Sequence, residues 1–399
     1  MIDKDSIPKH WKIKNLEDVC RKISLNNIKI KLKDYLPQGS FPIVDQGSEL
    51  IGGYSNNSKF IVPEEPPYVV FGDHTKVKKY INFKFIAGAD GIKVLKPLSE
   101  LDPKFLFYCL QIIKIPDKGY ARHFQFLEKE NVPIPPILEQ YKIVAKIEEL
   151  FSELDKGNQQ LETIRLQLKT YRQSVLKWAF EGRFTNKEFK IGQLPEGWRW
   201  VELDDICESK RKCSYGVLVP GDHEEDGIRL LRVGDINDTG QIDQINLKKI
   251  SPLIANKYKR TFLEGGEVVI SLVGAIGRTA VVPDSLKGAN IARAVGVIPI
   301  SKDISSKFVE LMLRSPLKIK EHNEKSHEVA RKTLNLEDVK NSKIPLPPRN
   351  IQEQIVQEIE IRLSVCDKLE ETITNCLQQS ESVRQSILKQ AFEGKMVYT

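Results

Sequence analysis

The sequence predicts an α+β protein built from two similar halves, each a globular domain followed by a long helix. Three observations carry this prediction: one motif occurs twice where helices end, another occurs twice where domains begin, and β-rich runs lie between them. We expect the two long helices to pair as an antiparallel coiled coil, which relates the halves by a pseudo-two-fold axis. The predicted parts are a first domain (1–132), a central helix region (133–185), a second domain (186–344) and a C-terminal helix region (345–399).

The helix regions carry the strongest repeat. The run "RQSVLKWAFEGR" at 172–183 returns as "RQSILKQAFEGK" at 384–395, 212 positions later. The same shift aligns "PIPPILEQYKIVAKIEELFSELDK" with "PLPPRNIQEQIVQEIEIRLSVCDK" without a gap. Such agreement is not a chance match, so one plan is written twice. Identical pairs include Pro133/Pro345, Gln140/Gln352, Ile143/Ile355, Ile147/Ile359, Asp155/Asp367 and Lys156/Lys368.

The domain starts carry the second repeat. "IPKHWKIKNLEDVC" at 7–20 matches "LPEGWRWVELDDIC" at 194–207, which places Trp11 opposite Trp198. A tryptophan repeated at one place could stack on a nucleic-acid base. Its fixed position beside a proline favours a buried anchor instead.

The long helices are predicted from their heptad spacing. After each Pro-rich hinge the chain can enter a helix, because proline is tolerated in the first turn or before it. We expect the first helix from about 137 to 181, ending at a C-cap glycine, Gly182, with Gly394 in the same role in the second copy. A helix that binds another protein is the alternative, and the two are compatible because a helix has several faces. The apolar series are Leu154, Leu161, Leu168 and Val175, with Ile164 and Tyr171 beside them, and Cys366, Ile373 and Ile387, with Leu369, Cys376 and Val383 beside them and Ser380 as a weak point.

The blocks between the repeats predict compact α+β domains. Runs such as "KFIVPEEPPYVVFGD", "KYINFKFIAGADGIKVL" and "GEVVISLVGAIGRTAVV" are β-rich and are punctuated by Gly, Asp, Asn and Pro. We expect helices near 103–114 and 305–323. Little aligns between the two blocks beyond Ala121-Arg122 with Ala330-Arg331.

The composition is that of an ordinary globular protein, with 399 residues, 40% of them hydrophobic, and a mean hydropathy of -0.34. No apolar run approaches the ~20 residues that a membrane helix needs. The start, "MIDKDSIPKHW", has neither an apolar signal segment nor an Arg/Ser-rich transit pattern. We therefore expect a cytoplasmic protein with no membrane partner.

The location of the positive charge is more informative than the net charge of +7. Segment 21–132 holds 17 Lys/Arg against 12 Asp/Glu, and segment 208–344 holds 23 against 18. The remainder of the chain is slightly acidic. A surplus confined to the two variable blocks suits an acidic partner such as nucleic acid, although ordinary solvated lysines would give the same count.

Motifs for catalysis are missing from the sequence. There is no GxxxxGK[ST] loop for ATP, no Asn/Asp-Pro-Pro-aromatic loop for methylation of an amine and no HExxH pair for a metal. Gly274-Ala-Ile-Gly277 is interpreted as a β-turn, and Pro116-Asp117 and Pro283-Asp284 as surface turns. The cysteines are scattered without CxxC spacing, so we expect neither zinc nor disulfides. They are Cys20, Cys109, Cys207, Cys213, Cys366 and Cys376.

The order of these motifs resembles the specificity subunit of Type I restriction-modification systems, the HsdS family. The resemblance rests on two variable domains, each closed by IP(I/L)PP...EQ..I and a long helix ending in RQS(I/V)L..AFEG(K/R), and covers essentially the whole chain. It implies a non-catalytic subunit whose two target recognition domains each read one half of a bipartite sequence in double-stranded DNA. The helices would set the spacing and dock other subunits.

The resemblance also implies partners and cofactors. Two methyltransferase (M) subunits would carry S-adenosylmethionine and methylate adenine, and two restriction (R) motor-nuclease subunits, with ATP and Mg²⁺, could join them. No cofactor or metal is expected in this chain itself.

Basic residues beside turns are the candidates for DNA contact. The alternative for each is a solvated surface charge, and Arg232 and Arg293 could instead be paired inside the fold. The candidates are Lys76, Lys78, Lys79, Arg122 and His123 in the first domain, and Lys210, Arg211, Lys212, Arg232, Arg278, Arg293 and Arg331 in the second.

Three other functions compete with this interpretation. An independent methyltransferase or nuclease is disfavoured by the missing motifs. A coiled-coil scaffold without a nucleic-acid role is disfavoured by the confinement of the basic surplus to the variable blocks. A stand-alone DNA-binding protein without a methyltransferase partner is the third.

Overall fold

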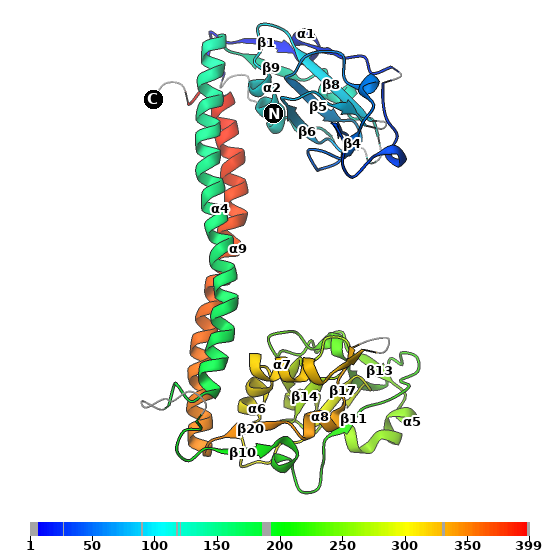
Figure 1. Cartoon of the computed structure of the whole chain (residues 1–399), viewed down its shortest axis with the longest axis vertical. Helices are drawn as coiled ribbons and strands as arrows, with labels where there is room; N and C mark the ends of the chain where they lie inside the picture. The colour runs from blue at the N-terminus through cyan, green and yellow to red at the C-terminus, as the bar shows by residue number, and fades with distance from the viewer. Residues whose placement is uncertain are drawn as a thin grey trace. The chain divides into compact units, whose positions relative to one another are not determined.

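The computed structural model describes residues 7–26, 28–88, 91–116, 119, 121–185, 193–328 and 332–396 (Figure 1). The chain forms two compact units, Met1–Glu162 with Thr374–Thr399, and Thr163–Ile373. We call them unit 1 and unit 2. Each unit contains one α+β domain, the first part of one long helix and the last part of the other. The chain is therefore α+β, as predicted, but each long helix is shared between units.

The first domain consists of two small sheets and a helix. The central strand run "YVVFG" is buried along its whole length because alternate side chains enter two different cores. Val69 and Phe71 face helix α2 (Pro103–Ile112), and Tyr68 and Val70 face the second sheet. The four-stranded sheet has the order β2 (Cys20–Lys22), β8 (Ile92–Pro97), β5 (Tyr68–Gly72), β6 (Lys78–Ile81), and the three-stranded sheet β4 (Gly53–Ser55), β3 (Phe41–Val44), β7 (Ile86–Ala87).

The second domain repeats this arrangement with more helices. Its four-stranded sheet has the order β11 (Ser214–Tyr215), β17 (Val295–Ile298), β14 (Val268–Ser271), β15 (Thr279–Val281). Its three-stranded sheet has the order β13 (Lys248–Ile250), β12 (Ile228–Leu231), β16 (Asn290–Ile291), and a ribbon pairs β18 (His327–Glu328) with β19 (Lys332–Thr333). The helices are α5 (Pro252–Ala255), α6 (Ser306–Leu313), α7 (Pro316–Lys325) and α8 (Leu336–Lys340).

The two domains share a topology that their sequences conceal. In both, the four-stranded sheet is antiparallel throughout. In both, the three-stranded sheet has one antiparallel and one parallel pair, and the parallel pair joins β3 to β7 or β12 to β16. The duplication therefore extends through the variable blocks, where residue-by-residue alignment failed.

Each domain opens and closes in a two-stranded antiparallel ribbon at the base of a long helix. In unit 1, β1 (Lys12–Asn15) pairs with β9 (Asn131–Ile134) beside the short helices α1 (Leu16–Val19) and α3 (Phe124–Leu127). In unit 2, β10 (Arg199–Glu202) pairs with β20 (Lys343–Leu346). The Pro-rich stretches follow β9 and β20, so they are the hinges that the sequence predicts.

The long helices are confirmed as α4 (Ile137–Phe180) and α9 (Arg349–Phe392), each of 44 residues. Each is about 66 Å long at 1.5 Å per residue. Gly182 and Gly394 follow the helix ends with φ of 81° and 72°, which confirms the predicted glycine caps.

One of the two predicted helix seams is buried and the other is not. The seam through Leu168, Val175, Cys366, Ile373 and Ile387 is buried. The neighbouring seam is largely exposed, because two paired helices can cover only one stripe of each other. Its exposed members are Ile164, Tyr171, Leu369 and Val383.

Each long helix ends against the domain of the other half. In unit 1 the Phe392 ring at the end of α9 packs edge-on against Phe105 of α2, with centroids 5.0 Å apart. In unit 2 the Phe180 ring at the end of α4 packs against Phe308 of α6 in the same way, at 5.4 Å. Figure 1 shows the last turns of α9, in red, beside the first part of α4 in unit 1. This exchange explains why the helix-end motif occurs twice.

Repeated ion pairs join the helices within each unit. In unit 2, Arg172 of α4 binds Asp367 (2.7 Å) and Glu370 (2.9 Å) of α9. In unit 1, the equivalent Arg384 of α9 binds Asp155 of α4. The two helices therefore pair antiparallel in both units, as predicted.

The repeated tryptophans lie at these joints and do not form a nucleic-acid platform. Trp11 is buried, and its indole N–H donates to Glu139 at 2.9 Å. Trp198 is half-buried against the main core of unit 2. The prediction of a buried core anchor is confirmed for Trp11, whereas Trp198 packs against the core but is only half-buried.

The smaller predictions are mostly confirmed. The expected helix at 103–114 is α2, but the one at 305–323 is split into α6 and α7, because Pro316 starts a new helix behind the capping residue Ser315. Gly274 and Gly277 form the turn between β14 and β15, and Asp284 begins a surface 3-10 helix. Asp117 lies outside the described residues. Within the described residues, no helix combines the length and apolar character of a membrane span.

Candidate nucleic-acid interface

The predicted residues of the first domain lie on two segments that Asp73 joins. Its carboxylate accepts a hydrogen bond from the Phe124 N–H at 2.8 Å, and its carbonyl oxygen lies 3.0 Å from His123 Nδ1. On the neighbouring residue, His74 Nδ1 lies 3.2 Å from the Ala121 carbonyl oxygen. The segment after β5 and the segment before α3 therefore form one surface.

Two residues of this surface stay candidates for DNA contact. Arg122 is exposed, and its side chain has no hydrogen-bond or ion-pair partner among the described residues. Lys76 is half-buried and adopts a left-handed backbone with φ of 61°, which is uncommon for lysine. These two remain the candidates of the first domain.

The other three residues support the fold. Lys79 is 5% exposed and donates to the carbonyl oxygens of Asp45 (2.9 Å) and Glu49, and burial lowers its pKa. Lys78 donates to the Ile113 carbonyl oxygen at 3.3 Å, and burial lowers its pKa to about 8. His123 is fully buried. The side chains of Lys79 and His123 are buried in this structure and cannot contact DNA there. Their selection as DNA-contact candidates from the sequence is therefore corrected.

Sequence reasoning missed a row of lysines in the first domain. Lys29, Lys31 and Lys33 are exposed, and none has an ion-pair partner among the described residues. They alternate with apolar residues in "IKIKLK", although Lys33 lies in the 3-10 helix Leu32–Asp34. That alternation was the available signal.

In the second domain, the segment 210–212 contains one free cation and two paired ones. Arg211 donates to the buried Glu267 at 2.8 Å and to the Phe262 carbonyl oxygen at 3.0 Å. Lys212 binds Asp204 at 3.3 Å. Lys210 is exposed, and no partner for it exists among the described residues. Arg211 therefore stabilises the fold, and Lys210 is the better candidate for DNA.

The remaining predicted arginines divide in the same way. Arg232 binds Asp235 at 2.8 Å yet stays 45% exposed, and Arg278 binds Asp238 at 2.6 Å. Arg293 is exposed, and the described part of the chain offers it no partner, so it is not paired inside the fold as the alternative suggested. Arg331 lies outside the described residues.

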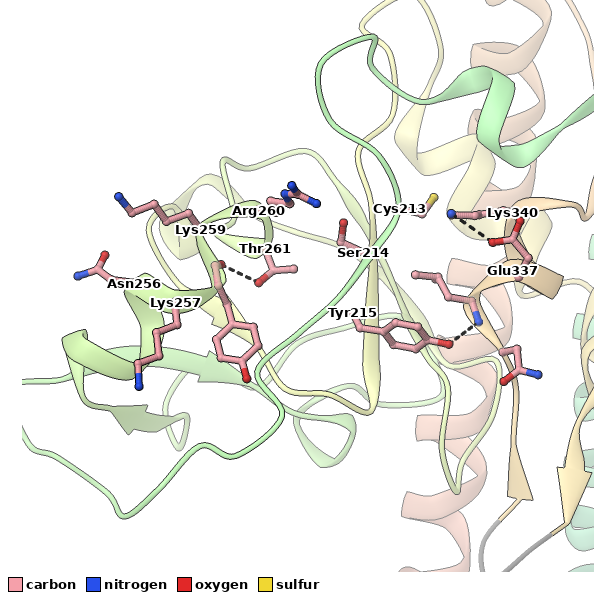
Figure 2. A pocket seen from close by; sticks show the side chains of 13 residues that line it. Cys213, Ser214, Tyr215, Asn256, Lys257, Lys259, Arg260, Thr261, Glu337 and Lys340 are labelled. Carbon is pink, nitrogen blue, oxygen red and sulfur yellow. Dashed lines mark hydrogen bonds and ion pairs between the residues drawn. The ribbon is translucent and has the colours of Figure 1, made fainter.

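A basic cavity of about 910 Å³ lies beside β11 and the start of α8 (Figure 2). Three of its cations, Lys257, Lys259 and Arg260, are exposed and unpaired within the described residues, and Lys340 binds Glu337 at 3.3 Å. Sequence reasoning missed all three, although "NKYKR" at 256–260 is a dense basic run. The three residues lie on the 3-10 segment Asn256–Thr261, which has a kink at Tyr258.

Buried polar groups hold this basic turn in place. Asn290 is fully buried, and its carbonyl oxygen accepts a hydrogen bond from the Thr261 hydroxyl at 2.6 Å. The Asn290 amide lies 3.3 Å from the Tyr258 carbonyl oxygen. On the other side of the cavity, the Tyr215 hydroxyl accepts from the Leu336 N–H at 2.7 Å, as Figure 2 shows.

A second cavity of about 980 Å³ adjoins the first and contains the predicted Arg293. Tyr215, Tyr258 and Asn335 line both cavities. The combined surface thus presents exposed cations, Arg293 among them, together with an amide and two aromatic rings. Cations bind phosphates and position a duplex, whereas arginine and asparagine can read base edges. This surface is the candidate nucleic-acid interface of the second domain.

One cluster in the described residues could hold a metal ion: Asp204, Cys207 and Cys213. It lies at the edge of the basic cavity, since Cys213 lines that cavity.

Comparison with known proteins decides the family. The family model described as "Type I restriction modification DNA specificity domain" matches residues 8–165 and 195–379. The chain belongs to this family. Each specificity-domain match runs from the repeated Pro-Trp turn through a globular domain into a long helix, so it coincides with the repeat found in the sequence.

Two relatives and one solved structure define the likeness. The Type I restriction enzyme EcoBI specificity subunit of Escherichia coli is 38% identical over 283 residues, which are 68% of this chain and 59% of that protein. The chain thus aligns with less than two thirds of that relative. The MjaVIII specificity subunit of Methanocaldococcus jannaschii is 23% identical over 98% of this chain and 94% of its own length. A chain from a structure on complex assembly and conformational transition of the type I R-M system has the same fold, with a TM-score of 0.71, 19% identity, and 98% and 99% coverage.

Proposed function

We propose that this chain is the DNA sequence-recognition subunit of a Type I restriction-modification complex. Each globular domain would read one half of a bipartite target in double-stranded DNA. The observation that carries the proposal is the double occurrence of one specificity domain, each copy with the same topology and its own exposed cations.

The cavities of unit 2 suggest how one half-site would be read. Lys257, Lys259 and Arg260 would bind phosphates, and Arg293 and Asn335 would face base edges. In the first domain, Arg122 and the row Lys29, Lys31 and Lys33 would take the phosphate-binding role. Because the two sets differ, the two domains would read different sequences.

The long helices would set the separation of the half-sites. Each helix begins at one domain and packs its final phenylalanine against the other, so the helix length would govern the spacing of the two recognition domains. A dimeric reader contacts half-sites about one helical turn of DNA apart. A longer helix would give a longer gap in the target.

The helices would also dock the catalytic subunits. In unit 2, Ile361, Val365 and Leu369 are about half exposed and recur every four residues, so they share one face of α9. An exposed apolar stripe on a paired helix fits a protein partner. Two methyltransferase subunits would bind there and in unit 1, bringing S-adenosylmethionine, and restriction subunits would bring ATP and Mg²⁺. This chain would supply no catalytic residue and would act in the cytoplasm, where host DNA lies.

Mapping of DNA methylation tests the proposal directly. The chain is co-expressed with a methyltransferase subunit of its own system, and adenine methylation in host DNA is mapped at base resolution. We expect one split motif with a constant gap, and none in a host that expresses the methyltransferase alone. A continuous motif, or no dependence on this chain, would contradict bipartite recognition.

A further inference from the structure

Two cysteines that are separated in the sequence meet in unit 2. The sulfur atoms of Cys207 and Cys213 lie 3.5 Å apart, and both residues are buried. Asp204 lies in the preceding 3-10 helix, Leu203–Ile206, and brings a carboxylate oxygen to the same place. The three ligand atoms lie within 4.8 Å of one another. The spacing D-x2-C-x5-C gave no sign of this in the sequence, which predicted no zinc site.

The geometry of the three atoms fits a tetrahedral ion. With zinc–sulfur bonds of about 2.3 Å, two ligands of a tetrahedral zinc lie roughly 3.8 Å apart. The two sulfur atoms are close to that separation in the absence of an ion. A bonded disulfide would need about 2.05 Å between them.

The carboxylate of Asp204 is arranged as a ligand would be. Its Oδ1 atom is buried and has no hydrogen-bond partner among the described residues. Its Oδ2 atom accepts a hydrogen bond from Lys212 at 3.3 Å. One oxygen is thus free to bind an ion while the other is held in place, as outer-shell groups commonly hold metal ligands.

We propose that Asp204, Cys207 and Cys213 bind one divalent ion of the zinc class. Binding displaces the two thiol protons to solvent and needs neither an oxidant nor a reductant. Two thiolates and one carboxylate give the loaded site a net charge of about −1, which Lys212 and Lys340 can balance. Cys213 borders the open basic cavity, so the ion can reach the site and a water molecule can fill its fourth position.

The site would fix the loop that carries the candidate DNA contact Lys210. That loop runs between two of the ligands, and Tyr215 follows only two residues after Cys213. An ion would therefore hold one border of the candidate interface.

Unit 1 offers an internal control. The repeat places Cys20 opposite Cys207 and ends there, and residues 21–32, which follow Cys20, contain no cysteine. The first half therefore lacks the second thiolate, and it should not bind the ion.

Metal content and cobalt spectroscopy of the full chain test the site. We expect about one zinc ion per chain by mass spectrometry, and on cobalt substitution a thiolate-to-cobalt charge-transfer band with tetrahedral d–d bands. Cys213→Ser should lose the charge-transfer intensity, Asp204→Asn should shift the d–d bands and weaken binding, and Cys20→Ser should change neither.

Two results would overturn the proposal. One is a folded wild-type chain that takes up no zinc or cobalt, or that carries a Cys207–Cys213 disulfide in place of an ion. The other is a charge-transfer band that survives Cys213→Ser. The metal content of the wild-type chain is sufficient to contradict the proposal, so the test does not depend on every variant folding.

Discussion

The joint between domain and helix is built from the same contacts in both halves. In the first half, the Gln140 amide oxygen accepts from the Asp102 N–H at 2.7 Å and its amide donates to the Pro135 carbonyl oxygen at 2.9 Å. In the second half, Gln352 accepts from Ser305 at 2.9 Å and donates to Pro347 at 2.9 Å. Asp102 and Ser305 cap α2 and α6, so one glutamine ties a domain helix to a hinge in each half.

The exposed cations of the two domains differ as much as the joints agree. The first domain presents three exposed lysines, Lys29, Lys31 and Lys33, whereas the second presents a basic cavity around Lys257, Lys259 and Arg260. The comparison shows two different constraints on the sequence. Residues at the joints must make the same contacts in both halves, whereas the exposed cations of the two domains can differ.

Exchange of the first variable block is expected to have the largest effect. Replacing residues 21–132 with the matching block of a relative should replace one half of the methylated motif and leave the other half and the gap unchanged, because the long helices and the hinge glutamines Gln140 and Gln352 lie outside the block. Base-resolution methylation mapping reads this out. A change in both halves of the methylated motif would show that the two domains do not recognise DNA independently.

Removal of a helix-end ring is expected to cost about 3–5 kcal/mol of unfolding free energy, as for other buried phenylalanines. Phe392→Ala and Phe180→Ala should have similar effects in urea unfolding, since Phe392 is fully buried and Phe180 nearly so. Val383→Ala, at an exposed position of α9, is the control and should change the stability by less than about 0.5 kcal/mol. Strongly unequal effects of the two phenylalanines would show that the joints differ.

Acid should weaken the second domain through His322, which has no counterpart in α2. Burial lowers its pKa to about 4, while Glu321, Lys318, Lys325 and Asp338 act as weaker neighbours. The unfolded chain takes up this proton near pH 6.5 and the folded chain only near pH 4, so stability is lost as the pH falls through that window.

The loss from His322 should reach about 2 kcal/mol by pH 5. His322→Leu should reduce the fall in urea midpoint between pH 7 and pH 5, whereas the exposed His223→Leu should not. An unchanged fall in the first variant would exclude His322 as the source.

Neutralising the basic cavity should give the smallest of these effects, a change in the salt dependence of DNA binding. Replacing Lys257, Lys259 and Arg260 with serine should lower the salt dependence of DNA binding, log K against log salt, by roughly 2.7 if all three contact phosphates. Lys320→Ser removes a lysine already near Glu324 and should have little effect. Fluorescence anisotropy with target DNA at several salt concentrations measures both slopes.

The helices and joints could be predicted because periodicity and repetition mark them. Heptads, hinge prolines and capping glycines placed α4 within one residue of its predicted end. The shared sheet topology could not be predicted, because strand pairing depends on long-range register and the two blocks use different residues for it.

The candidate site was predicted less well because burial decides which cations are free. Lys79 and Arg211 looked like surface cations in the sequence, yet both are bonded inside the fold. Lys257 and Arg260 stand in an equally basic run and are exposed. Similar local sequences thus have opposite roles, and only the tertiary partners distinguish them.

The exchange of helix ends also bears on synthesis of the chain. Ile387, Leu388, Ala391 and Phe392 belong to the same core as Phe105. As the ribosome makes the protein from its N-terminus, the first domain emerges well before α9, whose residues close its core. The apolar face of that domain stays uncovered until the end of α9 is made, and a chain cut before Ile387 would destabilise the domain that was made first.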